Sequence, residues 1–406
     1  MVKISKIFTL GVFLVFASCH SNQGNSQIRV SEGLQLFNCD SIETGAERTD
    51  LYFPQLKGKS IGLVCNQTSL IRNTHLIDIL INSGLKVKVI FSPEHGFIGN
   101  SDAGSDILDG TDSRTGVKII SLYGKKKKPS PGDLEGIDIL LFDIQDVGVR
   151  FYTYISTLTL IMEAASDEGI PLIVTDRPNP NGFYIDGPVL DTAFRSFIGM
   201  HPVPVVYGMT IGEYAMMING EGWLGDKKCD LTVIPMNGYS HNLIVRLNIK
   251  PSPNLPTWQS VYLYPSLCLF EGTIISVGRG TETPFQVIGH PHFVIGSYLF
   301  KPQSIPGVSE HPPYEGQVCL GTHLTGYAEN FLRNEHHFTL WYLISMHEFF
   351  KDSTEFFTPY FDKLAGTDQL RMDILKGIPE LEIRKSWEND LARFRQIRKK
   401  YLLYPD

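Results

Sequence analysis

The sequence predicts an α/β fold, in which a mostly parallel sheet covered by helices is followed by a second, smaller α/β or α+β domain. From about residue 59, apolar runs of strand length alternate with stretches of helical periodicity. The runs are apolar at nearly every position, as in parallel strands that are buried on both faces. The chain has 406 residues, more than one domain usually contains. We therefore expect one domain over residues 51–245 and an auxiliary domain over residues 246–406.

The strands are predicted from short runs of apolar and β-branched residues. After the last of them, Pro251, Pro253 and Pro256 indicate a hinge region that leads into the second domain. The expected strands cover residues 59–65, 87–91, 117–122, 137–142, 172–175 and 231–234.

The helices are predicted from apolar residues that recur at helical spacing. Helices at 74–83 and 153–168 are each followed by a glycine, which suits a helix C-terminus. Thr210 and Glu213 have the spacing of a capping box and predict a helix that continues to Ile218. A charged helix over 382–404 is expected to pack onto its own domain.

The first 18 residues have the features of a secretory signal: a basic start, a short apolar core and small residues before Cys19. The sequence before Cys19 resembles a bacterial lipobox, so Cys19 is predicted to carry the lipid and residues 19–50 to form the lipidated N-terminus and tether. The alternative is a plain signal peptide with an incidental cysteine. We expect a periplasmic, membrane-anchored lipoprotein of a Gram-negative bacterium, held by its lipid alone.

Composition and motifs argue against several classes of protein. The net charge of −7 gives no broad electrostatic reason to bind nucleic acid. The first strand–helix turn lacks the glycine pattern of dinucleotide-binding proteins, and neither a phosphate-binding loop nor a G-x-S-x-G elbow occurs. His290 and His292 have no adjacent acidic residue that would complete a metal site. The sequence therefore predicts neither a cofactor nor a metal.

Polar residues stand where the predicted parallel strands end. Such ends lie along one edge of an open sheet, and that edge usually holds the ligand. We therefore expect these residues to converge on one crevice. They are Asn66 and Gln67, Glu94 and His95, Asp143, Asp146 and Arg150, and Asp176, Arg177 and Asn179.

A crevice of this composition suits hydrolysis of a glycosidic bond, which needs an acid for the leaving oxygen and a second carboxylate at the anomeric carbon. Glu94 is the best acid, because Pro93 and Gly96 aim it from a strand end, and His95 is placed to orient it. Asp143 and Asp146 are candidates for the second carboxylate, and Asp176 is a weaker one; loop capping is the alternative for Asp146 and Asp176. A substrate carboxylate could be bound through two hydrogen bonds by the guanidinium of Arg150, Arg177 or Arg279. The alternative is that these arginines form salt bridges with neighbouring acidic residues.

Nine segments of the chain have a distinctive sequence. They are Cys65–Thr68, Phe91–Phe97, Leu141–Ile155, Asp176–Gly182, Asp186–Leu190, Tyr207–Glu213, Pro251–Thr257, Leu269–Thr273 and Gly278–Thr281. Taken together, they resemble one bacterial family, the exo-β-N-acetylmuramidases of the NamZ type, and the likeness runs from about residue 55 to the C-terminus. The resemblance implies a Rossmann-like catalytic domain, an auxiliary domain, and release of N-acetylmuramic acid from the non-reducing end of peptidoglycan fragments, with Glu94 in the position of the catalytic glutamate.

The resemblance also gives the other residues a purpose. Muramic acid carries a lactyl carboxylate, for an arginine, and an N-acetyl group, for Asn66, Gln67, Asn179 or Asn181. Independently of the likeness, the second domain is expected to reach the pocket through Glu271, Arg279 and Glu282, because ligand clefts favour domain interfaces. The long loop 99–115 is expected to close the pocket. Aromatic residues that could stack on the sugar are Phe97, Tyr152 and Tyr154. Alternatives are a lipoprotein that binds muropeptides without cutting them and, less favoured, a metal-free amidase or esterase.

Overall fold

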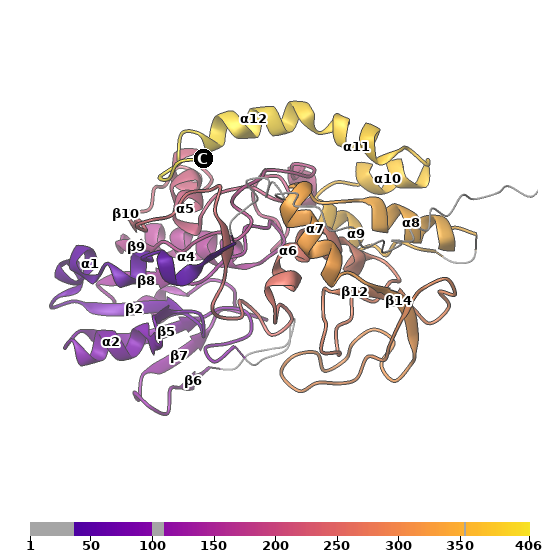
Figure 1. The fold of residues 1–406 in the computed structure, drawn as a ribbon. Helices are drawn as coiled ribbons and strands as arrows, with labels where there is room; N and C mark the ends of the chain where they lie inside the picture. Colours follow the sequence, from indigo (N-terminus) through magenta and orange to yellow (C-terminus); the bar gives the residue numbers. More distant parts are fainter. Residues whose placement is uncertain (1–35, 100–108, 353–354) are drawn as a thin grey trace, which may run out of the picture. The chain divides into compact units, whose positions relative to one another are not determined.

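The computed structural model describes residues 36–99, 109–352 and 355–406 (Figure 1). Its main sheet has seven strands in the order β10-β9-β8-β2-β5-β7-β6, and only β6 runs antiparallel to its neighbour. Numbered along the chain, the parallel strands have the order 3-2-1-4-5-6 of a doubly wound, Rossmann-like sheet. The strands are β2 (Ser60–Cys65), β5 (Lys86–Ser92), β6 (Gly110–Thr111), β7 (Lys118–Ser121), β8 (Ile139–Asp143), β9 (Leu172–Thr175) and β10 (Leu231–Ile234).

Burial explains why the apolar runs predicted these strands correctly. Every residue of β2, β8 and β9 is buried. Neighbouring residues of one strand enter different cores, because successive side chains point to opposite faces. Val64 packs with α4 (Tyr154–Glu168) and α5 (Ile211–Gly220), while Leu63 packs with α1 (Thr49–Leu56) and α2 (Leu76–Asn82). Helices therefore cover both faces of the sheet.

The helix boundaries follow local signals. Gly169 ends α4 in the left-handed conformation, with φ of 65°, and its N–H donates to the carbonyl of Ala165. Thr210 and Glu213 form the expected capping box of α5. The helix predicted at 74–83 is shorter, because β4 (Thr74–His75) pairs with β3 (Leu70–Ile71) before α2 begins.

The remaining elements before residue 257 are short. β1 (Leu36–Asn38) pairs in parallel with β11 (Ile244–Arg246). The predicted tether over 19–50 is therefore wrong from residue 36 onward, where the chain already belongs to the fold; Cys19 and the signal segment lie outside the described residues. The other short elements are η1 (Cys39–Ser41), η2 (Gly45–Glu47), α3 (Pro131–Leu134) and η3 (Thr192–Phe194).

The second half of the chain is mainly helical around a small antiparallel sheet. That sheet has the order β12-β14-β13, and the aromatic-rich helices pack on the same core as α4. The elements are α6 (Trp258–Leu267), η4 (Cys268–Gly272), β12 (Val287–His290), β13 (Tyr298–Phe300), β14 (Cys319–His323), α7 (Thr325–Asn334), α8 (Trp341–Phe350), α9 (Phe361–Ala365) and α10 (Gln369–Leu375).

The C-terminal segment differs from the prediction of one helix packed on its own domain. Two helices form, α11 (Glu380–Ser386) and α12 (Glu388–Arg398). The chain then returns to the first half beside α5 (Figure 1), where the Tyr404 hydroxyl donates to Asp176 Oδ2 at 2.6 Å. Arg398 Nε donates to the carbonyl of Gly208 at 2.8 Å. The last residues therefore complete the packing of the first half.

Within the described part of the chain, every helix is too short or too polar to cross a lipid bilayer.

Candidate active site

Glu94 lies on a tight turn directly after β5. Pro93 precedes it, and the N–H of Gly96 donates to the carbonyl of Pro93 at 3.0 Å. His95 has φ of 69° and Gly96 has φ of 77°, so the turn passes through the left-handed region. This conformation is costly for a residue with a Cβ, and such strain concentrates at functional sites. The turn fixes the position from which Glu94 projects, as the sequence predicted.

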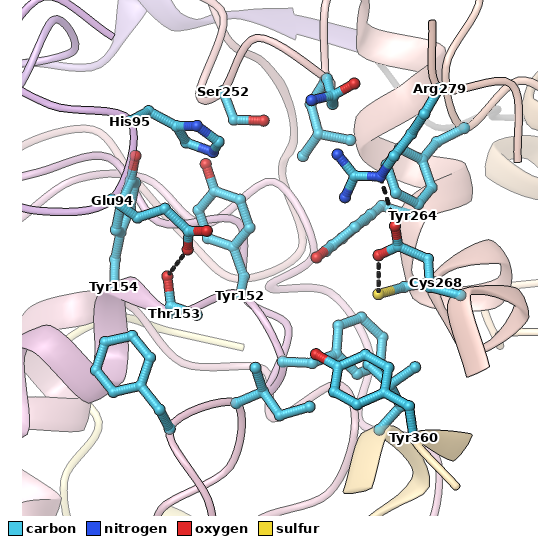
Figure 2. Close-up of a pocket in the computed structure, with 18 of the residues that line it drawn as sticks. Glu94, His95, Tyr152, Thr153, Tyr154, Ser252, Tyr264, Cys268, Arg279 and Tyr360 are labelled. Atoms are coloured by element: carbon cyan, nitrogen blue, oxygen red, sulfur yellow. Dashed lines mark hydrogen bonds and ion pairs between the residues drawn. The ribbon is translucent and has the colours of Figure 1, made fainter. Parts of the chain in front are cut away.

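Glu94 and His95 line a cavity of about 590 Å³, within the size range of ligand pockets. Figure 2 shows Glu94 and His95 on one side of the pocket and Arg279 on the other. The walls come from both halves of the chain: Glu94 follows β5, Thr153 precedes α4, Glu271 lies in η4 and Tyr360 precedes α9. The pocket therefore needs both halves.

The Glu94 carboxyl is half-buried, and its Oε2 accepts a hydrogen bond from the Thr153 hydroxyl at 2.6 Å. Thr153 is the N-cap residue of α4, yet its side chain makes no capping bond. Its hydroxyl is used for Glu94 instead. One carboxyl oxygen of Glu94 is thus held by a rigid helix end, which leaves the side chain little rotational freedom.

Tyr152 and Tyr154 line the pocket together with Glu94, and their ring centroids lie 4.8 Å apart in an edge-to-face arrangement. The Tyr152 hydroxyl donates to the carbonyl of Pro251 at 2.8 Å, and the Tyr154 hydroxyl accepts from Asn66 Nδ2 at 2.9 Å. Burial raises the pKa of both phenols, so both stay neutral. Phe97, also predicted as a sugar-stacking ring, instead packs in the core against His75.

The opposite wall carries an ion pair. Arg279 Nε lies 2.5 Å from Glu271 Oε1, and the Cys268 thiol lies 3.6 Å from Glu271 Oε2. Burial by itself lowers the pKa of Arg279, but the Glu271 carboxylate more than offsets this and the pKa lies above its ordinary value. The guanidinium also lies 5.1 Å from the centroid of the Phe285 ring. Glu282, predicted to join this wall, is exposed and outside the lining.

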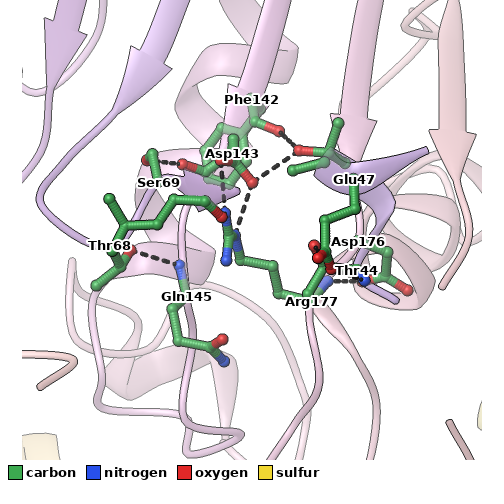
Figure 3. Close-up of polar contacts among 12 residues, drawn as sticks. Thr44, Glu47, Thr68, Ser69, Phe142, Asp143, Gln145, Asp176 and Arg177 are labelled. Atoms are coloured by element: carbon green, nitrogen blue, oxygen red, sulfur yellow. Dashed lines mark hydrogen bonds and ion pairs between the residues drawn. The ribbon is translucent and has the colours of Figure 1, made fainter. Parts of the chain in front are cut away.

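Asp143 and Arg177 lie elsewhere, in a buried ion pair at the ends of β8 and β9 (Figure 3). The guanidinium donates to both carboxylate oxygens, at 2.7 and 2.8 Å, and to the carbonyl of Leu70. The Thr175 hydroxyl donates to Asp143 Oδ1 at 2.8 Å. Neither charged residue lines the pocket of Glu94, so the predicted convergence is wrong for this pair, whose charges satisfy each other.

Asp146 and Arg150 are also outside that pocket. Asp146 accepts hydrogen bonds from the Tyr207 hydroxyl and from the N–H of Gly148, and burial raises its pKa to about 6. The prediction that Asp143 or Asp146 stands beside Glu94 is therefore wrong. Arg150 has no exposed surface, and burial lowers its pKa to about 9. Within the described part of the chain it has no carboxylate partner, and it donates to four carbonyl oxygens, those of Pro188, Val203, Leu364 and Ala365.

The residues predicted to bind the substrate through amides are mostly structural. Asn66 Nδ2 donates to the Tyr154 hydroxyl, and Gln67 Nε2 donates to the carbonyl of Pro251 at 3.2 Å. Asn179 Nδ2 donates to Met209, and Asn181 Nδ2 to Val147. None of these four lines the pocket of Glu94, so the sequence placed them correctly near strand ends but wrongly in one crevice.

Asp176 is a buried structural acid. It accepts from the Thr210 and Tyr404 hydroxyls and from the N–H groups of Arg177 and Gly212. Burial, together with the nearby Glu213 carboxylate, raises its pKa to about 7. These contacts agree with loop capping, which was the alternative to a catalytic role for Asp176.

A second hollow of about 1,060 Å³ lies over the cluster in Figure 3, lined by Thr68, Gln145, Arg177 and residues 41–44 among others. Among the described residues, no group of three or more His, Cys, Asp or Glu side chains is placed to hold a metal ion. The expected lid over 99–115 falls largely on residues 100–108, which lie outside the described part.

Several pocket residues had no role assigned from the sequence. Thr153 lies inside one of the segments that carry the family likeness, and this was the only feature of the sequence that pointed to it. Six further residues have no local feature that predicts a place in the pocket, because they reach it from distant loops and from α9. They are Tyr123, Lys127, Phe197, His311, Tyr360 and Lys363.

Comparison with known proteins agrees with this two-part site. The N-terminal model of the exo-β-N-acetylmuramidase NamZ family matches residues 61–259, and the C-terminal model matches residues 262–404. A peptidoglycan β-N-acetylmuramidase NamZ from Bacillus subtilis (strain 168) is 42% identical over 375 residues, which are 87% of this chain and 89% of the relative.

Two crystal structures of DUF1343 family proteins from Bacteroides fragilis NCTC 9343 have the same fold. Their TM-scores are 0.82 and 0.74, at 45% and 28% sequence identity. Each comparison covers 90% of this chain and 99% of the solved one. The family models and the long alignment confirm the resemblance found in the sequence, and the chain belongs to the exo-β-N-acetylmuramidase NamZ family.

Proposed function

We propose that this protein is a glycoside hydrolase that releases N-acetylmuramic acid from the non-reducing end of peptidoglycan fragments. The observation that carries the proposal is the position of Glu94, held on a strained turn and bonded to Thr153 inside a sugar-sized pocket. Family membership supplies the substrate class, because the Bacillus subtilis relative is a peptidoglycan β-N-acetylmuramidase.

In this mechanism Glu94 is the general acid that protonates the glycosidic oxygen as the bond to the anomeric carbon breaks. The second carboxylate role falls to Glu271, because it is the other acidic side chain among the described residues that line the pocket. Arg279 fixes the Glu271 carboxylate from one side. Tyr152, Tyr264 and Tyr360 offer ring surface to the apolar face of the sugar.

The test compares Glu94→Gln with Glu282→Gln. The glutamine keeps the shape and the Thr153 contact but holds no transferable proton. Release of N-acetylmuramic acid from a defined fragment should fall about 100- to 10,000-fold, while affinity for the fragment changes only a few-fold. Glu282 is exposed and outside the pocket, so its variant controls for loss of a glutamate.

Unchanged turnover of Glu94→Gln would refute the acid role. A wild-type protein that binds the fragment but releases no sugar would instead identify a non-catalytic muropeptide-binding protein. The two results are separate, because binding and release are measured on the same samples.

We further propose that the protein is exported and anchored in the periplasm of a Gram-negative bacterium through a lipid on Cys19. Support comes from the basic start, the apolar core and the small residues before Cys19. Mass spectrometry of the membrane fraction should find acyl chains on Cys19, and Cys19→Ala should move the protein to the soluble fraction. Retention of Cys19→Ala in the membrane would contradict the anchor.

A further inference from the structure

The four consecutive lysines of the loop from Lys125 to Lys128 have side chains in different environments. Lys126 pairs with Asp133 at 3.1 Å, and Lys128 pairs with Asp167 at 2.7 Å. Lys125 is exposed. Lys127 alone among them lines the pocket of Glu94. A run that reads as a solvated loop thus contributes one cation to the active site.

The Lys127 ammonium is held in place without an anion. Its Nζ lies 4.3 Å from the centroid of the Phe197 ring, and Phe197 lines the same pocket. Lys127 is half-buried, and no described acidic side chain forms an ion pair with it. A cation–π contact orients an ammonium but does not neutralise it. Lys127 therefore keeps its capacity for a carboxylate.

The other basic residues of the pocket are less suited to bind an anion. The Arg279 guanidinium already has the Glu271 carboxylate at 2.5 Å. Lys363 is exposed on α9, where water competes for its ammonium. Arg150 and Arg177, the other arginines expected here, are used inside the fold. Lys127 is the half-buried cation of the described pocket that lacks a counter-charge.

We propose that Lys127, oriented by Phe197, binds the free lactyl carboxylate of the terminal muramic acid and so selects this sugar over N-acetylglucosamine, which lacks that group. The inference rests on the proposed function, since it names the recognition element of the same pocket. A charge-assisted bond to a carboxylate is stronger than a neutral one, and it is lost when the carboxyl becomes an amide. The site therefore favours fragments whose lactyl group carries no peptide.

Binding is measured by calorimetry with three ligands: N-acetylmuramic acid, its lactyl methylamide, and the derivative with L-alanine on the lactyl group, which moves the carboxylate to the peptide. Lys127→Met should weaken binding of the free acid about 10-fold or more and leave the methylamide within about twofold. Lys127→Arg should restore most of the affinity. Lys125→Met, from the same loop, should behave as wild type.

Equal weakening of the acid and the methylamide by Lys127→Met would show a structural role and overturn the inference. The inference would also be overturned if Lys363→Met removed the preference for the free acid over the methylamide. The same holds if the alanine derivative bound more tightly than the free acid and this binding depended on Lys127. No saturable binding of the acid to the wild type would overturn it as well. Sugar release is assayed in parallel. If Lys127 is needed for the preference for the free acid but no sugar is released, only the proposed hydrolase activity is refuted. If sugar is released but the preference does not depend on Lys127, only the role of Lys127 is refuted.

Discussion

Two charged clusters lie at the carboxyl ends of the main sheet, and they are built on opposite principles. At the ends of β8 and β9, Asp143 and Arg177 satisfy each other in a fully buried pair. In the pocket after β5, Glu94 is half-buried, and among the described residues its hydrogen-bond partner is the Thr153 hydroxyl on one of its two oxygens. Charge density alone does not identify an active site. The difference is whether polar atoms remain open to a ligand.

The strand order places the topological switch point between β2 and β8, where doubly wound proteins usually bind their ligand. Here hydrogen bonds join the two loops: Gln145 N–H donates to the Thr68 hydroxyl, and the Ser69 hydroxyl to the carbonyl of Asp143. The hollow of about 1,060 Å³ lies over them. The pocket with Glu94 lies beyond the end of β5 and is completed by the second half of the chain. The pocket of Glu94 is therefore separate from the hollow over Arg177, and the second half of the chain completes it.

The largest effect is expected from breaking the buried pair. Arg177→Met leaves the Asp143 carboxylate buried without its cation, and the free energy of unfolding should fall by about 3 to 5 kcal/mol. Arg371→Met is the control, because the Arg371–Asp362 pair has the same two-bond geometry but is partly exposed, so it should cost about 1 kcal/mol or less. Urea unfolding measures both. Equal losses would show that burial gives the Asp143–Arg177 pair no special effect on stability.

Glu271→Gln should have the next largest effect, and on activity instead of stability. It removes the second carboxylate of the pocket, so kcat should fall about 100-fold while the free energy of unfolding changes by about 1 kcal/mol or less. Proton NMR of the first sugar released by the wild type gives the anomeric configuration. Full activity of Glu271→Gln would remove Glu271 from the mechanism and leave the second carboxylate unassigned.

The pH dependence of stability provides a third test. The folded-state pKa of Asp176 is raised to about 7 and that of Asp146 to about 6, from an ordinary 3.8. Between pH 4 and 7 the folded protein therefore retains protons that the unfolded chain has lost, and these two groups make stability fall as the pH rises. Asp176→Asn should remove part of that slope, at most about 1.4 kcal/mol per pH unit.

Urea titrations at pH 5, 6 and 7 measure this slope, and Asp226→Asn is the control, because Asp226 is exposed. A slope that is the same in Asp176→Asn and wild type would mean that Asp176 is ionised in the folded protein throughout this range.

The smallest effect is expected from Tyr404→Phe. It removes the 2.6 Å bond to Asp176 and the acceptor for the N–H of Met236, so unfolding should become easier by about 1 to 2 kcal/mol. Sugar release per folded molecule should not change, because Tyr404 is not among the described residues that line the pocket. A loss of specific activity would instead couple the C-terminus to the pocket.

Much of the fold was predictable, because the signals are local. Buried strands such as β2 and β8 are apolar throughout, and Gly169 and Thr210 mark helix ends by their own chemistry. Long-range partners leave no such signal. Asp176 is a site residue or a structural acid depending on Tyr404, which is 228 positions away. The prediction of one crevice was therefore wrong for Asp143, Asp146 and Asp176.

The candidate site was predicted in part. Glu94, His95, Glu271 and Arg279 do line one pocket, and the last two were expected there because ligand clefts favour domain interfaces. Lys127 was not predicted, since four identical lysines give no indication of which one turns inward. Only the positions of Asp133, Asp167 and Phe197 distinguish them.

The return of the C-terminal residues to the first half has a consequence for how the protein is made. Residues 398–406 are synthesised after the whole first half, yet Asp406 contacts Arg398 and His241, and Tyr404 contacts Asp176. The seven-stranded sheet can form its strand pairs earlier in synthesis, but these last contacts must wait until residues 398–406 have left the ribosome. Shortened versions that stop at the boundary between the two family models would leave Asp176 without the Tyr404 hydroxyl and His241 without the Asp406 carboxylate, and a purification tag is better attached elsewhere than after residue 406.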